Sequence, residues 1–221
     1  STVMPVMSQI KETSDKQKIK FFILDAVRIH NLIFVPITIL LFFIAEPFIR
    51  LWMGEKYLEY INFIRLTIVF QLIWQSSAMF GQLYMGLGFS KKPGIAAIII
   101  GVLNVLLSVI LVNYMGVEGV VLGTIIVGVI SVPFAVSWYL PDVDIKPKNY
   151  FFNTLFKTQA PLIIAGAVLF ILYDLILKIN SWLQLGFVSI SILIYLVMVI
   201  FFIVLNKEQR EKVKNKLGIV A

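Results

Sequence analysis

Six long apolar stretches constrain the fold of this chain more than any other feature of its sequence. Each is long enough to cross a hydrocarbon core of about 30 Å, which takes a helix of about 20 residues. Inside lipid, a single spanning segment satisfies its backbone hydrogen bonds only as a helix, and the alternating pattern of a membrane β-barrel is missing. The sequence therefore predicts an all-α integral membrane helical bundle of about six transmembrane helices. The stretches run over roughly residues 29–51, 61–87, 95–115, 117–140, 160–177 and 182–205.

The composition supports a membrane location for most of the chain. Of the 221 residues, 60% are hydrophobic and 14% are charged, and the mean hydropathy is +0.95. Soluble globular proteins carry about 25% charged residues. Little sequence is left over for a soluble domain.

The sequence offers no chemistry for a metal centre or for catalysis. It has no cysteine, and its single histidine, His30, cannot build a histidine-ligated metal site alone. A glycine-rich phosphate loop, an HExxH motif and a GxSxG motif are all missing. We therefore expect no catalytic residue, no metal and no cofactor, and a protein that is not an enzyme.

Basic residues near the ends of the spans predict the orientation, because Lys and Arg stay on the cytoplasmic side. One set of alternate connections holds 15 Lys and Arg residues, whereas the other set holds 3: Arg50, Lys56 and Lys178. This asymmetry predicts a multi-pass protein of the cytoplasmic (inner) membrane with both ends of the chain in the cytoplasm. The net charge of +7 then reflects orientation and contact with membrane lipids, so nucleic acid is not an expected partner.

Polar side chains inside the spans are the candidates for function. Gln71, Gln75 and Gln82 are spaced by 4 and 7 residues, which places them on one stripe of a helix. Gln75 lies near the middle of its span, as Asn104 does in the next one, and transporter sites are found near the bilayer midplane. These amides either hydrogen-bond across helix–helix interfaces or line a hydrated cavity, since both roles need the same inward orientation.

Arg65 is the most costly polar residue in these spans, because an arginine at a helix centre costs on the order of 2.5 to 3.5 kcal/mol on insertion. One interpretation is that it extends to the outer face or pairs with Glu59 or another acid. The other is that it lines a cavity and meets a phosphate or carboxylate, since a guanidinium binds such oxygens with two hydrogen bonds. The sequence leaves both interpretations open.

The stretch IAEPFIRLWMGEKY, residues 44–57, is predicted to be a hairpin at the outer face. Glu46 and Arg50 are four residues apart and can pair as the helix emerges. Trp52 suits the headgroup boundary, and Gly54 permits the reversal of the chain.

Small residues in the third and fourth spans predict close helix packing. Gly119 and Gly123 form a GxxxG pair, and five further residues share one face of the third span: Gly94, Ala97, Gly101, Asn104 and Ser108.

Three stretches in this order resemble a known family: PVMSQIKETSDKQKIKFFILDAVRIHNLIFVPITILLFFIAEPFIRLWMGEKY, then GQLYMGLGFSKKPG, then NVLLSVILVNYMGVEGVVLGTIIV. They are similar to motifs of the polysaccharide flippases of the multidrug/oligosaccharidyl-lipid/polysaccharide exporter superfamily. This is the group related to O-antigen and teichoic acid exporters and to the lipid II flippase. The resemblance covers roughly residues 5–140, and the last two spans match in hydropathy alone. Ser108, Val120 and Val121 depart from the family pattern.

The resemblance implies that the chain is the C-terminal portion of a larger two-lobed transporter, with the N-terminal lobe missing here. Residues 1–28 would then be the end of a preceding span and a cytoplasmic connector, and residues 29–140 a four-helix part of the C-terminal lobe. A cytoplasmic loop over residues 141–159, two additional transmembrane helices over 160–205 and a cytoplasmic tail over 206–221 would follow.

The resemblance also implies a function. Such a protein flips a polyprenyl-diphosphate-linked oligosaccharide across the cytoplasmic membrane by alternating access, with coupling to an ion or to the membrane potential. The lipid-linked oligosaccharide and membrane lipids are then the expected partners. Arg65 would attract the diphosphate, and amides would hydrogen-bond sugar hydroxyls. The expected substrate cavity comprises Arg65, Gln71, Gln75, Gln82 and Asn104.

Two other functions remain as alternatives. A multidrug or cation exporter of the same superfamily would need an acid deep in its cavity, and none of these spans holds a central Asp or Glu. A membrane-embedded glycosyl- or acyltransferase would need an acidic or histidine-containing loop at the membrane face. Only PDVDIKPKNY, with Asp142 and Asp144, resembles such a loop, and we interpret its acids as turn residues that balance lysines.

Overall fold

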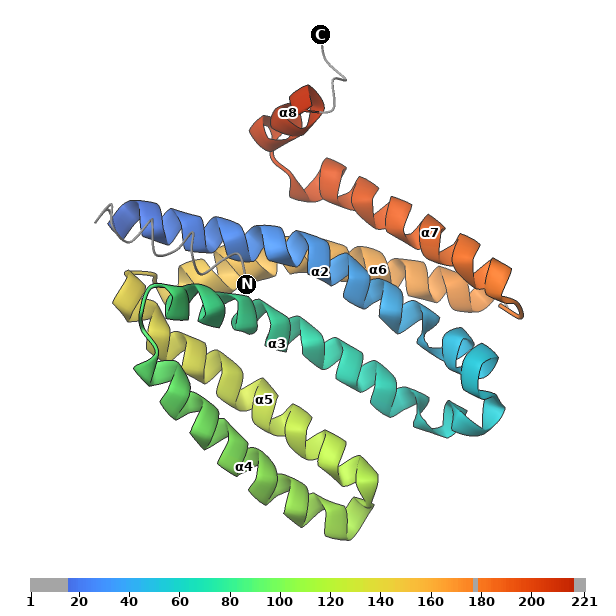
Figure 1. Ribbon diagram of the computed structural model, residues 1–221. Coiled ribbons are helices and arrows are strands. Elements are labelled where there is room, and N and C mark those ends of the chain that lie inside the picture. The colour runs from blue at the N-terminus through green and yellow to red at the C-terminus, as the bar shows by residue number, and fades with distance from the viewer. Residues whose placement is uncertain (1–15, 177–178, 217–221) are drawn as a thin grey trace.

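The computed structural model describes residues 16–176 and 179–216, and within these ranges it confirms an all-α helical bundle with no strand (Figure 1). Six helical segments are long and apolar enough to cross a membrane, as predicted. Their main helices are α2 (Lys16–Met53), α3 (Ile61–Gly86), α4 (Lys91–Met115), α5 (Val117–Tyr139), α6 (Lys157–Ile176) and α7 (Trp182–Val199). Shorter elements are the 3₁₀ turns η1 (Glu55–Tyr60) and η2 (Leu140–Val143), the π-helices η3 (Asn149–Phe156) and η4 (Ile200–Val204), and the helix α8 (Lys207–Lys216).

The helix α2 begins at Lys16, whereas the sequence pattern placed a charged connector there and the first span at residue 29. Its 38 residues extend about 57 Å at 1.5 Å per residue, well beyond the hydrocarbon core. The additional turns are amphipathic, because Ile23 and Val27 are fully buried while Lys16 and Lys18 are exposed. A prediction from hydropathy ends the span where charged residues begin. The helix itself continues as long as one of its faces can still be buried.

The predicted loop over residues 141–159 is also largely helical. After η2 the chain turns at Asp144, which has a φ of 54°, and then enters η3, which leads directly into α6. Tyr150 is completely buried, and its hydroxyl donates to the backbone carbonyl of Ser76 at 3.0 Å. This aromatic side chain therefore folds the connection back onto the bundle.

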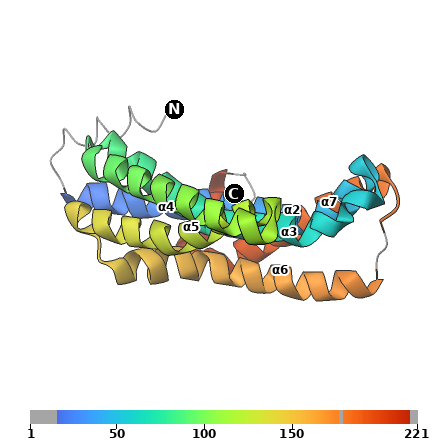
Figure 2. The ribbon, with the colours of Figure 1, turned by 90° about the horizontal axis from the view of Figure 1, so that it is seen from below.

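The long helix α2 runs through the centre of the bundle (Figure 1). The α4–α5 hairpin lies beyond α3, and Figure 2 shows α6 on one side of the layer that contains α2, α3 and α4. Two apolar cores hold these helices together. The first gathers around Ile23, Phe80, Tyr84, Tyr139 and Tyr150, and the second joins α2 to α6 and α7 through Val35, Phe43, Leu162, Ile192 and Leu196.

The GxxxG pair packs α5 closely against α4, as the sequence predicted. A Cβ on Gly123 would lie 2.8 Å from the hydroxyl oxygen of Ser108, and one on Gly119 would collide with the backbone of Leu111. Gly94 and Gly101 behave differently, because a Cβ on either would meet no atom within 4 Å. The glycines of α5 therefore serve helix packing within this chain, whereas Gly94 and Gly101 of α4 do not.

Candidate functional site

The hairpin predicted at residues 44–57 forms and positions the first charged cluster. The helix α2 ends at Met53, and Gly54 reverses the chain with a φ of 91°. Arg50 donates to the Glu46 carboxylate at 2.6 Å, which confirms the predicted pair. Arg65 of α3 donates to the second oxygen of the same carboxylate at 3.2 Å.

Arg65 is therefore paired with an acid, but with Glu46 rather than Glu59. Its guanidinium also lies over the rings of Phe42 and Phe170, 5.5 Å from each ring centroid. Only 20% of the side chain is exposed. Cations and aromatic rings attract each other more strongly where water is excluded, so the two rings help to hold Arg65 inside the bundle.

The charges of this cluster do not balance. Arg50 and Arg65 share one carboxylate, so the three side chains carry a net charge of +1. The Nε atoms of both arginines are buried and have no hydrogen-bond partner among the described residues. A buried donor without a partner costs free energy, and an oxyanion is the kind of acceptor that such donors and an excess positive charge favour.

An apolar pocket, the slot, adjoins this cluster. It has a volume of about 340 Å³ and is formed by α2, α3 and α6. The rings of Phe42 and Phe170 line it, so the Arg65 guanidinium over these rings lies at the boundary of the slot. The other lining residues are mostly aliphatic and include Ile39, Ile68, Leu72 and Gly166.

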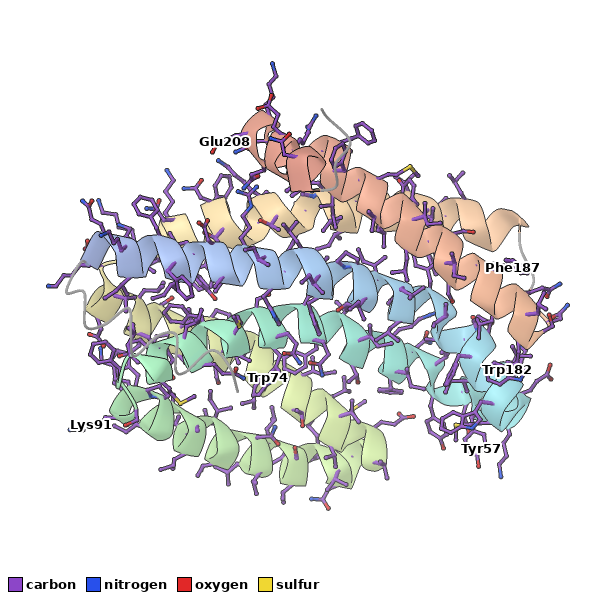
Figure 3. The ribbon with its side chains drawn as sticks, turned by 45° about the horizontal axis from the view of Figure 1, so that its top comes forward. Tyr57, Trp74, Lys91, Trp182, Phe187 and Glu208 are labelled. Atoms are coloured by element: carbon purple, nitrogen blue, oxygen red, sulfur yellow. The ribbon has the colours of Figure 1, made fainter. Side chains whose placement is uncertain are left out.

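A second and larger pocket, the groove, lies between α3 and α4, with α5 beneath both. Its volume is about 850 Å³, and Trp74, which Figure 3 labels on α3, contributes to its lining. Gln82 and Asn104 both line the groove, so the structure brings these two predicted site residues together. Asn104 accepts a hydrogen bond from Ser108 at 3.3 Å, which orients its amide.

The five predicted site residues do not share one pocket. Arg65 adjoins the slot, and Gln82 and Asn104 line the groove. Gln71 and Gln75 line neither of them. The Gln71 carbonyl oxygen is buried without a hydrogen-bond partner among the described residues, and Gln75 is half-buried.

The sequence pattern missed a buried polar network that links α2, α3 and α6. Ser76 donates to the carbonyl oxygen of Asn31 at 2.6 Å, and the Gln159 amide donates to the same oxygen at 2.7 Å and to the Ser76 hydroxyl at 2.8 Å. Asn31 and Ser76 are each 1% exposed. These residues lie more than 40 positions apart, so no periodicity in the sequence connects them.

A second missed cluster, the clamp, consists of Tyr84, Lys92 and Asp142. The Asp142 carboxylate pairs with Lys92 at 2.7 Å and accepts a hydrogen bond from the Tyr84 hydroxyl. Lys92 also donates to the backbone carbonyl of Trp138 at 3.1 Å. Asp142 lies in the turn η2, as interpreted from the sequence, but its partners are side chains of α3 and α4 rather than the lysines that follow it in the chain.

The described residues offer no ligand set for a metal ion. Within residues 16–176 and 179–216, no group of three or more His, Cys, Asp or Glu side chains gathers that could hold an ion. The arrangement instead offers cations, amides and apolar surfaces, which together suit an amphipathic anion.

Comparisons with known proteins place the chain in a family. A family model described as the lipid II flippase MurJ matches residues 1–198. The chain is also similar to the uncharacterized membrane protein EpsK of Bacillus subtilis (strain 168), at 23% identity over 220 residues, which cover 98% of this chain and 43% of EpsK. The chain thus spans less than half the length of this curated relative. No solved structure matches it.

Proposed function

This chain belongs to the lipid II flippase MurJ family, and we propose that it takes part in flipping a polyprenyl-diphosphate-linked oligosaccharide across the cytoplasmic membrane. The family membership and the six spans make it a multi-pass membrane protein of a family of flippases, which are transporters rather than enzymes. The substrate, the membrane and the orientation with both chain ends in the cytoplasm are part of the proposal.

The observation that carries the proposal is the charge imbalance at the boundary of the slot. A lipid-linked oligosaccharide joins an anionic diphosphate to a long apolar chain. Arg50 and Arg65 offer an excess positive charge and two unused donors, and the slot beside Arg65 is almost entirely apolar. Guanidinium groups bind phosphate oxygens through paired hydrogen bonds, and apolar surface buries the chain.

The groove supplies a complementary role for the two amides that it brings together. Gln82 and Asn104 can donate to and accept from sugar hydroxyls, since each amide carries both kinds of group. Gly94 and Gly101 keep the groove wide, because no side chain of theirs fills it. In this proposal, Gln71 and Gln75 join the substrate path when a second lobe packs against α3, and an ion or the membrane potential drives the alternation.

Replacement of Arg65 tests the proposal directly. In cells that depend on this protein for a surface polysaccharide, Arg65→Ala should reduce the polysaccharide at least tenfold while the protein level in the membrane stays normal. Loss of one charge-assisted phosphate contact costs about 1.5 to 3 kcal/mol, which corresponds to a loss of this size.

The control is Lys56→Ala, which removes an exposed cation from the same end of the bundle. It should leave the polysaccharide unchanged. Normal output from Arg65→Ala at normal protein level would remove Arg65 from the substrate path.

The alternative functions receive less support from the geometry. Glu46, which lies beside the slot through Arg65, already holds two arginines and cannot readily bind a cationic drug. Asp142 is held by Lys92 and Tyr84, whereas Asp144 is exposed on a turn. A transferase would need one of these acids to face a substrate pocket.

A further inference from the structure

The groove has two walls that do not bond to each other directly. The walls are α3 and α4, and among the described residues no hydrogen bond or ion pair joins a side chain of one to the other. Both helices rest on α5 instead. Figure 1 shows the α4–α5 hairpin diverging from α3 away from the connection between α3 and α4.

The clamp ties the two walls together at one end of this groove. Met85, Ser90 and Pro93 line the groove at that end, and they neighbour the clamp residues Tyr84 and Lys92 in sequence. Tyr84 belongs to the last turn of α3 and Lys92 to the first turn of α4. Figure 3 labels the adjacent Lys91 at this end of α4.

A single carboxylate makes both links, because Lys92 and Tyr84 each bond to the same oxygen of Asp142. Losing this carboxylate therefore removes both links at once, while Lys92 keeps its bond to the Trp138 carbonyl of α5. The aromatic rings around it stack without any bond across the groove: Tyr84 lies 5.1 Å from Tyr139 and 4.9 Å from Phe89 between ring centroids.

The ion pair of the clamp is partly accessible to water. The side chains of Lys92 and Asp142 are each 29% exposed, so water competes for the ion pair. Ion pairs that remain in contact with water contribute little net stability. The connection between the walls is also short, and Gly88 within it has a φ of 90°, which gives the backbone a glycine hinge.

We propose that the Tyr84–Lys92–Asp142 clamp is a gate that closes one end of the groove by holding α3 and α4 together, and that breaking it opens the groove at that membrane face. This inference goes beyond the proposed function. The gate is defined by the distance between the end of α3 and the start of α4, and it does not depend on which molecule passes between them.

The test measures that distance in the full chain reconstituted into liposomes. The chain contains no cysteine, so Met85→Cys and Ile95→Cys can carry two spin labels without any background site. Double electron–electron resonance should give a narrow distance distribution for the otherwise unchanged chain. Asp142→Asn and Tyr84→Phe should each shift the distribution to longer distances and broaden it, the first more than the second because it removes the negative charge that both links share.

Two further variants separate a gate from a merely structural contact. Asp144→Asn is the matched control on the same turn, and it should leave the distribution unchanged. The exchange Lys92→Asp with Asp142→Lys restores the ion pair between α4 and η2 and should restore the narrow distribution. Tyr84→Phe keeps the ring and its stacking, so it reports on the gate even if Asp142→Asn does not fold.

Unchanged distances in Tyr84→Phe and Asp142→Asn would overturn the proposal, as would an equal shift in Asp144→Asn. A charge exchange that fails to restore the distribution would also count against it. None of these results depends on transport. The proposed function can therefore be refuted while the gate is confirmed, and the gate can be refuted while the proposed function is confirmed.

Discussion

At the scale of single residues, the polar side chains of this bundle differ in whether other groups of the chain satisfy their hydrogen bonds. Asn31 and Ser76 are buried and fully engaged in a network, so they stabilise the fold. Arg65 is held by Glu46 and two rings but keeps an unused buried donor. Structural polar residues have all their hydrogen bonds satisfied within the chain, whereas candidates for binding keep an unused donor or acceptor. Burial and polarity alone do not distinguish the two groups.

Replacing Asn31 by Ala should destabilise the bundle by about 1 to 2 kcal/mol, because Ser76 and Gln159 lose their common acceptor inside the protein. The midpoint of unfolding of the purified chain, titrated from mild into denaturing detergent, measures this loss. Asn113→Ala is the control, since Asn113 is exposed and donates to a carbonyl of its own helix, that of Val109. Equal losses in both variants would mean that the network contributes nothing specific.

At the scale of elements, the helices form where the sequence pattern placed them, but their ends and contacts follow from packing. The α4–α5 hairpin illustrates this point. Its glycines are alike in sequence, yet Gly119 and Gly123 lie against α4 whereas Gly94 and Gly101 face the open groove. The first pair determines how closely two helices approach, and the second pair determines the width of a pocket.

Gly123→Ala should therefore destabilise the chain by about 1 to 3 kcal/mol, because the added methyl group collides with Ser108 and forces the helices apart. Gly101→Ala should leave stability unchanged or slightly improved, since its methyl group meets open space and alanine favours the helix. Thermal unfolding followed by circular dichroism distinguishes the two. A Gly101→Ala variant as unstable as Gly123→Ala would show that the groove is closed in the native protein.

At the scale of the whole molecule, the bundle divides into two apolar cores around the long helix α2. One core joins α2 to α3, α5 and the η2–η3 connection, and the other joins it to α6 and α7. The slot lies between α2, α3 and α6, and the groove lies on the side of α3 that faces α4. The helix α3 thus contributes to both pockets, which explains why Arg65 adjoins the slot while Gln82 lines the groove.

The orientation of the molecule is a prediction that impermeant labelling can check. In the chain without natural cysteines, Lys56→Cys should react with a membrane-impermeant maleimide in intact cells. Lys148→Cys should react only after the membrane is opened, because basic connections stay in the cytoplasm. Both side chains are exposed, so access to the label depends on the side of the membrane rather than on burial. The reverse pattern would invert the proposed topology.

Much of the fold follows from the sequence because hydropathy reports directly on the solvent around a helix. The predicted stretch at 61–87 became α3, Ile61–Gly86, and the stretch at 117–140 became α5, Val117–Tyr139. The reversal at Gly54 and the Glu46–Arg50 pair also follow, since both depend on residues within one turn of each other. The start of α2 and the helical form of residues 149–156 do not, because there the helix is stabilised by distant partners.

The sequence by itself determined the membrane location, the helices and a short set of polar residues that hydrocarbon would exclude. Only the tertiary structure decided how these residues combine. It paired Arg65 with Glu46, separated Arg65 from Gln82 and Asn104, and joined Asp142 to Lys92 and Tyr84. The physical reason is one of range: hydropathy and helical periodicity act between neighbours in the chain, whereas pockets and charge partners are set by helices that meet far apart in sequence.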